Sequence, residues 1–247
     1  MIEPSIHYRL AGYASLSRSD VVLDVGAGLG FLTRFLAGIC KRVLAVESDS
    51  RLARILRDQL KDLSNVEVIE GDVLKVSTFH FDAVVSIPPY HISSPLLLRL
   101  FGERFERGVL IFQKEFANRL VAPVGSEKYG WLTVVTYYYA DAELLDDVPK
   151  WMFYPQPKVD SVIVRLKSKK SPPFELKNKT VFKQLAQVLF TRRNRKVRNA
   201  VKHFLKGTQP TAAKNIGEAA NFLPFEDKRV RELAPEDFGA LANALYR

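Results

Sequence analysis

Short apolar segments alternate with amphipathic ones through the first two-thirds of the chain, which has 247 residues. The apolar segments are rich in Val, Ile and Leu, and the segments between them repeat apolar residues every three or four positions. Short buried strands separated by helices predict a parallel sheet covered on both faces. The expected strands are Val21–Val25, Arg42–Val46, Val66–Ile69, Ala83–Val85 and Val109–Phe112, with helices around Phe31–Leu36, Leu52–Leu60, Pro95–Phe101 and Glu115–Val121.

The pattern changes further along the chain. Trp131–Tyr139 (WLTVVTYYY) and Ser161–Leu166 (SVIVRL) are rich in β-type residues with no helical pattern between them, so we expect an antiparallel edge pair that closes the sheet. Lys167–Pro173 (KSKKSPP) reads as a linker. A helical pattern then runs from Phe182 to Phe204, and Gly207 and Pro210 are expected to end it. Glu226–Tyr246 predicts one or two short helices, the last starting at Pro235.

These patterns predict an α/β domain over residues 1–168 and a small basic helical domain over residues 169–247. The N-terminal segment carries an acidic residue and no long apolar core, so it is not expected to be a secretory signal. No apolar run approaches the ~20 residues that span a bilayer. A single cysteine excludes an internal disulfide, and four scattered histidines predict no metal site. We expect a cytoplasmic monomer.

Positive charge is concentrated in one part of the chain. The net charge is +10, and the segment from Leu176 to Gly217 contains no acidic residue. It does contain Lys177, Lys179, Lys183, Arg192, Arg193, Arg195, Lys196, Arg198, Lys202, Lys206 and Lys214. Such a segment repels itself, so a polyanionic partner is favoured over a merely solvated helix face.

Polar groups follow the first three expected strands. Asp24–Gly30 (DVGAGLG) is a glycine-rich turn that opens a helix, and Glu47 and Asp72 follow the second and third strands. Glycines there let the backbone approach a ligand, and a carboxylate can accept both ribose hydroxyls or an adenine amino group. Each feature alone has a structural alternative, as a turn or a helix N-cap, but together they favour a nucleoside cleft at the carboxyl edge of the sheet.

The fourth strand ends in an unusual segment, VVSIPPYHISSP, over residues 84–95. Two prolines hold the loop outward, so we expect the ring of Tyr90 to be exposed. His91 is read as a loop residue rather than as a catalytic base. Tyr90 as a core residue that caps the strand is the alternative.

Together with four downstream motifs, this order of segments resembles the small-subunit ribosomal RNA adenine dimethyltransferases. The motifs are Gln113–Leu120 (QKEFANRL), Ser126–Leu132 (SEKYGWL), Phe153–Ser161 (FYPQPKVDS) and Phe190–Asn199 (FTRRNRKVRN). The resemblance implies a seven-stranded Rossmann-like methyltransferase sheet with a helical C-terminal domain. It also implies methyl transfer from S-adenosylmethionine to N6 of two adjacent adenosines near the 3′ end of small-subunit RNA, with the immature small subunit as partner.

The resemblance also implies the roles of individual residues. At the cofactor it places Asp24, Gly26, Ala27, Gly28, Glu47, Ser48, Asp72, Val73 and Ser86. At the target base it places Ile87, Pro88, Pro89 and Tyr90. Along the RNA it places Lys114, Arg119, Arg192, Arg193, Arg195, Lys196 and Arg198, with a basic helix around Arg192–Arg198.

Two departures from the family pattern keep alternatives open. Ile87 stands where the family has asparagine, whose oxygen helps to orient the adenine amino group, and the loss of such an acceptor typically costs ~10²–10³ in rate. His7–Leu10 (HYRL) is a poor counterpart of the family's Gln-His-Phe-Leu-like segment, so the chain is either naturally short or its start is set too late. The alternatives are an active but slower or monomethylating enzyme, a non-catalytic ribosome-assembly factor, and an adenine methyltransferase acting on DNA or on another RNA.

Overall fold

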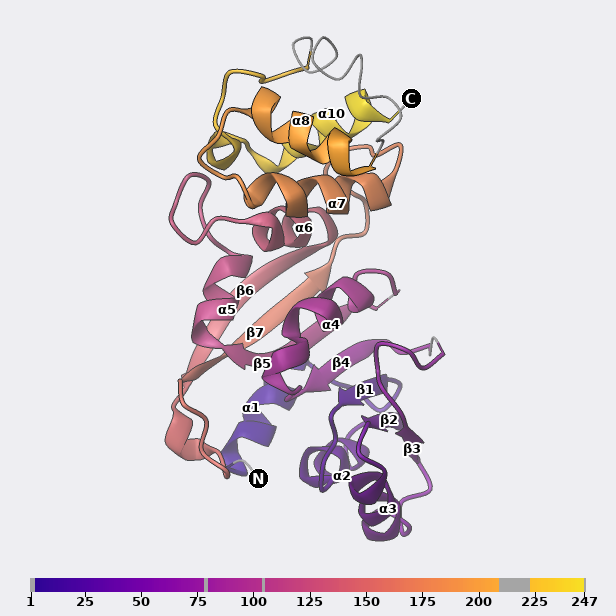
Figure 1. The fold of residues 1–247 in the computed structure, drawn as a ribbon. Coiled ribbons are helices and arrows are strands. Elements are labelled where there is room, and N and C mark those ends of the chain that lie inside the picture. Colours follow the sequence, from indigo (N-terminus) through magenta and orange to yellow (C-terminus); the bar gives the residue numbers. More distant parts are fainter. Residues whose placement is uncertain (1–2, 78–79, 104, 209–222, 247) are drawn as a thin grey trace. The chain divides into compact units, whose positions relative to one another are not determined.

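The computed structural model describes residues 3–77, 80–103, 105–208 and 223–246 (Figure 1). The chain divides into two compact units. The first contains Met1–Ala117 and Ala140–Ser168, and the second contains Asn118–Tyr139 and Lys169–Arg247. The expected division at residue 168 differs in one respect, because Asn118–Tyr139 belongs to the unit that carries the C-terminal helices.

The first unit is built on a seven-stranded sheet with the order β3-β2-β1-β4-β5-β7-β6. Neighbours from β3 to β5 are parallel, whereas β7 is antiparallel to both β5 and β6. The strands are β1 (Val21–Val25), β2 (Arg42–Glu47), β3 (Val66–Glu70), β4 (Ala83–Ser86), β5 (Arg107–Gln113), β6 (Ala140–Val148) and β7 (Ser161–Ser168). This arrangement confirms the predicted Rossmann-like methyltransferase fold.

Apolar side chains from the strands and two helices form the core on one face of the sheet. Helices α1 (Ser5–Ala14) and α2 (Phe31–Ala37) bury Ile6, Leu10 and Leu36 there. Alternate residues of the central strands point to the same face because the side-chain period of a strand is two. These residues include Val22, Val43, Ala83, Val85, Val109, Ile111 and Ile163.

The order of the strands fixes where a ligand can bind. β1 pairs with β2 on one side and with β4 on the other, so the connections leaving β1 and β4 diverge at the carboxyl edge of the sheet. In open α/β sheets, ligands bind at such a switch point. Asp49 caps the start of α3 (Ser50–Gln59) by accepting the N–H groups of Arg51 and Leu52, so the chain enters a helix three residues after β2 ends.

The prediction that Trp131–Tyr139 forms a strand is wrong: this segment is helix α6, and the partner of β7 is the acidic segment of β6. Six of its nine residues are buried, so tertiary packing outweighs the β propensity of its Val, Thr and Tyr residues. The Thr133 hydroxyl accepts the Gly130 N–H at 3.3 Å, which satisfies a free donor at the start of the helix. β6 is the last strand in the sheet order, beside β7, and such an edge position suits its charged residues.

The second unit is helical. Its helices include α6, α7 (Lys179–Phe190), α8 (Val197–Thr208) and α10 (Pro235–Leu245), and it receives the end of α5 (Lys114–Leu120). Tyr129 packs edge-on against Phe190 at 5.4 Å and donates a hydrogen bond to the Leu233 carbonyl at 2.7 Å. Pro235 starts α10, as predicted.

The helical pattern from Phe182 to Phe204 is interrupted in the structure. It holds two helices, α7 and α8, separated by a turn, and α8 continues past Gly207 to Thr208, so this glycine does not end it. The expected break at Pro210 lies outside the described residues.

Candidate active site

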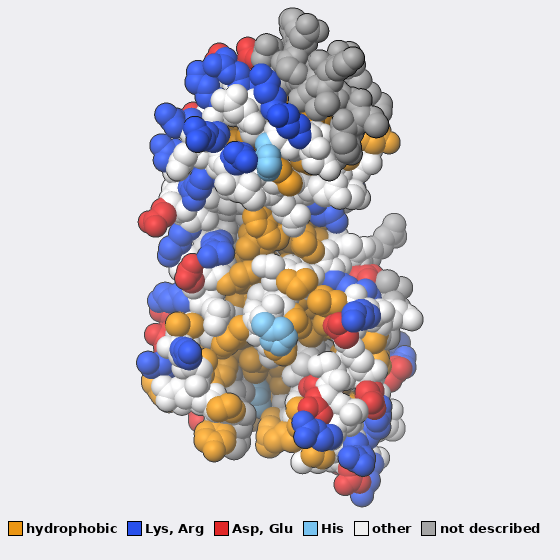
Figure 2. Space-filling view, in the orientation of Figure 1, with side chains coloured by type: hydrophobic (Ala, Val, Ile, Leu, Met, Phe, Trp, Pro, Cys, Tyr) orange, Lys and Arg blue, Asp and Glu red, His pale blue; other side chains and the backbone are white. Residues whose placement is uncertain are grey.

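A cavity of about 270 Å³ lies at the switch point of the sheet. The glycine turn after β1, the start of α2, the end of β4, the loop after the short helix η2 (Lys150–Met152) and α1 all contribute to its wall. The lining residues are His7, Asp24, Gly26, Ala27, Gly28, Leu29, Phe31, Leu32, Ile87, Phe153, Tyr154 and Pro155. In the space-filling view, apolar side chains border a hollow in the lower part of the first unit (Figure 2).

The glycine turn has a conformation that other residues adopt only with strain. Gly26, Gly28 and Gly30 have φ values of +71°, +57° and +81°. A Cβ added to Gly26 would lie 2.7 Å from Cδ of Pro89, so the turn after β1 packs directly against the loop after β4. The two segments that the sequence assigned to cofactor and target base are therefore in contact. Glycine is required at position 26 because of its positive φ value and because Pro89 leaves no space for a side chain.

Two carboxyl groups support the turn in different ways. Asp24 lies at the cavity with 2% exposure and accepts a hydrogen bond from the Thr33 hydroxyl at 2.8 Å. Burial raises the pKa of its carboxyl group to about 7, and the nearby Glu47 adds to the increase. Glu47 is also buried, and its two oxygens accept the N–H groups of Gly28 and Asp49, each at 2.9 Å. Each carboxylate oxygen has two lone pairs, so Glu47 still has capacity for ribose hydroxyls.

The loop after β4 turns as its two prolines predicted. Pro88 is buried, Pro89 is exposed, and Tyr90 begins the short helix η1 (Tyr90–Ile92). Tyr90 is half-buried rather than exposed, because its hydroxyl shares a 2.7 Å hydrogen bond with Ser161 of β7. Burial raises the pKa of this phenol. His91 is exposed, in line with its reading as a loop residue.

Ser86 and Ile87 face different surroundings. The Ser86 hydroxyl donates to the Val25 carbonyl at 2.7 Å and accepts the Val25 N–H at 3.0 Å, so it joins β4 to β1. Its only donor is used in this way. The side chain of Ile87 is partly buried, packs against the core and lines the cavity. The cavity wall at the end of β4 is therefore apolar.

Five expected cofactor residues lie outside the cavity lining: Glu47 and Ser86, which support the turn and β4, and Ser48, Asp72 and Val73. Ser48 is exposed, Val73 is buried, and Asp72 is half-exposed. The Asp72 carboxylate accepts the Leu74 N–H at 2.9 Å within a turn, so it does not cap a helix, which was its structural alternative.

The cavity also contains residues that the sequence reasoning did not assign to it. Phe153, Tyr154 and Pro155 belong to a motif that was noted without a role, and Phe31 follows the glycine turn directly. His7 belongs to the segment HYRL, a poor counterpart of the family's N-terminal motif. The only sequence signal for it was a histidine at a buried position of an apolar helix face, beside Ile6 and Leu10.

The expected basic helix around Arg192–Arg198 is a turn followed by the start of α8. Residues Thr191–Arg195 line a hollow of their own, and Figure 2 shows Lys and Arg side chains gathered over this part of the second unit. The guanidinium of Arg193 donates to the carbonyls of Glu127 and Ser126 at 2.5 and 2.7 Å, so it also holds a loop in place. A nitrogen of Arg192 lies 3.3 Å from Nδ1 of His203.

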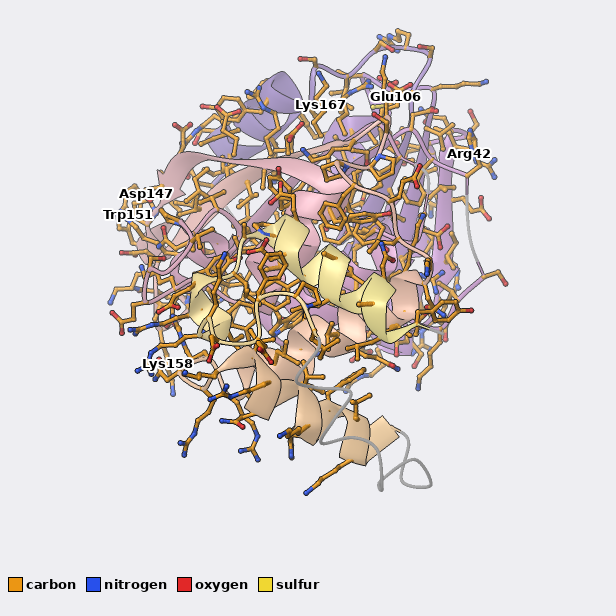
Figure 3. The ribbon with its side chains drawn as sticks, turned by 90° about the horizontal axis from the view of Figure 1, so that it is seen from above. Arg42, Glu106, Asp147, Trp151, Lys158 and Lys167 are labelled. Atoms are coloured by element: carbon orange, nitrogen blue, oxygen red, sulfur yellow. The ribbon has the colours of Figure 1, made fainter. Side chains whose placement is uncertain are left out.

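The remaining basic candidates have carboxylate partners or other contacts. Lys196 and Arg198 lie 2.8 and 3.1 Å from the same oxygen of Asp227. In the first unit, Lys114 pairs with Asp147 of the edge strand at 2.7 Å. In the view of Figure 3, Asp147, Trp151 and Lys158 lie at an edge of the first unit. Arg119 takes part in a further contact, and its carbonyl accepts the Thr133 hydroxyl.

The fold and the site together define the class of S-adenosylmethionine-dependent methyltransferases. The defining features are the strand order of the sheet, the glycine turn after β1, the acidic residue after β2 and the antiparallel β7. Residues 2–233 match the family model described as ribosomal RNA adenine dimethylase. The chain belongs to this family, and the protein is an S-adenosylmethionine-dependent ribosomal RNA adenine methyltransferase.

Individual relatives agree with this assignment. The chain is 42% identical over 240 residues to a probable ribosomal RNA small subunit methyltransferase A of Methanosarcina acetivorans, covering 96% of this chain and 88% of that protein. Among solved structures, it is similar to a dimethyladenosine transferase from Plasmodium falciparum, with a TM-score of 0.83, 30% identity, and coverage of 98% of this chain and 95% of that one. It is also similar to the 23S rRNA methyltransferase ErmE, with a TM-score of 0.70, 27% identity and 98% coverage of both chains.

Proposed function

We propose that this protein methylates N6 of two adjacent adenosines near the 3′ end of small-subunit ribosomal RNA. We further propose that it acts on the immature small subunit, as a cytoplasmic monomer. The observation that supports the proposal is the contact between Gly26 and Pro89, because it joins the glycine turn after β1 to the loop after β4, and both Gly26 and Ile87 line one cavity. No helix in the described part of the chain is long and apolar enough to cross a membrane.

The residues around the glycine turn fit S-adenosylmethionine, which supplies a methyl group on a positively charged sulfur when bound. Gly26 and Gly28 leave the space that a side chain would fill. Asp24 is a buried carboxyl whose raised pKa reflects an uncompensated burial cost, and a cationic amino group would relieve it. Glu47 holds the turn through Gly28 and can accept ribose hydroxyls. We assign Ala27 to the same turn, and Ser48, Asp72 and Val73 to the outer part of the adenosine site.

The loop after β4 is proposed to hold the target base. The hydroxyl of Tyr90 in this loop shares a hydrogen bond with Ser161, which limits the motion of the ring on which an adenine can stack. The backbone carbonyl of Pro88 is proposed to accept a hydrogen bond from the amino group of the base. Pro89 packs the loop against the glycine turn. Ser86 joins the two strands beneath the site rather than contacting the cofactor directly.

The second unit is proposed to bind RNA phosphates through the turn between α7 and α8. Arg192 and Arg195 are the leading candidates on this turn, since Arg193 is engaged with two backbone carbonyls. Lys196 and Arg198 share one carboxylate and are expected to contribute less, and Lys114 and Arg119 are assigned to secondary contacts. Guanidinium groups suit phosphates because their donors match phosphate oxygens in pairs.

Catalysis is favoured over a purely structural role in ribosome assembly. An assembly factor that bound no cofactor would gain nothing from a buried Asp24 or from a glycine turn held by Glu47. The test is transfer of labelled methyl groups from S-adenosylmethionine to small subunits that lack the modification. Retained subunit binding without transfer would support the assembly factor, and transfer to duplex DNA or to unrelated RNA would support a different substrate.

A further inference from the structure

The apolar end of β4 leaves a chemical requirement unmet. The exocyclic amino group of an adenine carries two hydrogens, and a closed site that removes water from them must supply acceptors. The Pro88 carbonyl can serve one hydrogen. Ile87, the residue before Pro88, lines the cavity, and its side chain has no acceptor. A second acceptor has to come from another element.

His7 is a polar group without a partner in the wall of this cavity. It comes from α1, is 6% exposed, and lines the same cavity as Ile87 and Asp24. Among the described residues, nothing forms a hydrogen bond with its Nε2 atom, which is shielded from solvent. Its ring lies 5.9 Å from that of Phe35, an apolar contact that does not satisfy the nitrogen. A buried polar atom without a partner is costly, so a polar ligand is a physical reason for its presence.

The protonation state of His7 suits an acceptor. Burial lowers the pKa of its imidazole, so the ring is neutral near neutral pH. A neutral imidazole has one nitrogen that donates and one that accepts, and the ring can present the latter to a ligand. The other lining side chains with an acceptor are Asp24, which we assign to the cationic amino group of the cofactor, and Tyr154, which is 76% exposed.

We propose that the imidazole of His7 accepts a hydrogen bond from the exocyclic amino group of the target adenosine, the role for which residue 87 has no suitable atom. This inference rests on the proposed function and deepens it, because it names a second positioning group for the base. The contact fixes the amino group within the cavity and transfers no proton. It also explains why a histidine occupies a core position of α1 where an apolar residue would pack as well.

The test measures recognition of the amino group without requiring turnover. Small-subunit RNA is prepared with either adenosine or purine riboside, which lacks the amino group, at each target position, and its affinity is measured with the cofactor product bound. The wild-type protein should prefer adenosine by about tenfold, the range of one hydrogen bond. His7→Phe keeps a ring beside Phe35 and should reduce the preference to about one. His7→Gln, which carries an amide oxygen, should restore most of it.

Two further variants complete the design. Ile87→Asn combined with His7→Phe should recover the preference by returning an acceptor to the other wall. His80→Phe removes an exposed imidazole of the same unit and should leave the preference unchanged. Thermal unfolding establishes that each variant is folded, and His7→Leu replaces His7→Phe if the larger ring prevents folding.

Two results would overturn the inference. One is an undiminished preference for adenosine in His7→Phe. The other is weaker binding of S-adenosylmethionine alone in that variant, because His7 would then serve the amino group of the cofactor. The proposed function fails separately, through absence of methyl transfer by the wild-type protein, and that outcome leaves the binding comparison readable.

Discussion

Replacement of Gly26 by alanine tests whether contact between the glycine turn and Pro89 organises the site. The φ value of +71° costs an alanine about 1–2 kcal/mol, because its Cβ approaches the backbone in this conformation. The added Cβ would also lie 2.7 Å from Pro89 Cδ, whereas ordinary contact begins at 3.4 Å. Forcing such an overlap in a packed region typically costs about 1–3 kcal/mol. The two effects together predict a loss of about 2–5 kcal/mol in the free energy of unfolding.

Gly125 provides a matched control for the backbone effect. Its φ value is +80°, and an added Cβ would meet nothing within 4 Å. Gly125→Ala should therefore lose only the conformational part, about 1–2 kcal/mol. Urea unfolding followed by circular dichroism measures both variants. Gly26→Ala should also bind S-adenosylmethionine more weakly and transfer methyl groups more slowly, since Pro89 must move. Equal destabilisation by the two substitutions, with unchanged transfer by Gly26→Ala, would refute the contact.

Three further predictions concern charge and burial. Asp24→Asn should make the ligand-free protein more stable than the wild type, by a margin that grows as pH rises. The folded-state pKa of Asp24, about 7, exceeds that of the unfolded chain, so the wild type loses stability between about pH 4 and pH 7, by up to about 4 kcal/mol. Thermal unfolding across pH should show the two proteins converging at low pH, and parallel curves would contradict the buried carboxyl. The double substitution Arg192→Gln and Arg195→Gln should weaken RNA binding and reduce the slope of the logarithm of the binding constant against log[salt] by about two. Arg51 is an exposed arginine of the first unit, and Arg51→Gln should change neither quantity. Tyr129→Phe should destabilise the second unit by about 1–3 kcal/mol, because it leaves the Leu233 carbonyl without its partner; an unchanged midpoint of unfolding would argue against that bond.

The fold of the first unit followed from the sequence because its strands are short, apolar and bounded by turns. Trp131–Tyr139 shows the limit of such reasoning. Its composition favours a strand, yet six of its residues are buried in the second unit, and only the tertiary packing decides for a helix. The true edge strand, Ala140–Val148, is rich in acidic residues because an edge needs few apolar contacts.

The candidate site was predictable where backbone geometry demanded particular residues. Glycines at positive φ and prolines in a turn leave a clear pattern, and the structure places Gly26 against Pro89. His7 and Arg193 left no such pattern. The importance of His7 depends on which cavity its helix faces, and the backbone partners of Arg193 are distant in sequence. Both facts belong to tertiary structure.

The most direct test of the account is the product of the reaction. Small subunits lacking the modification are incubated with the protein and labelled S-adenosylmethionine, and nucleosides from the digested RNA are separated by mass. The account predicts N6-methylated adenosine, confined to the two adjacent target positions near the 3′ end of the small-subunit RNA. No methylated adenosine, or label on another nucleoside or another RNA, would contradict it.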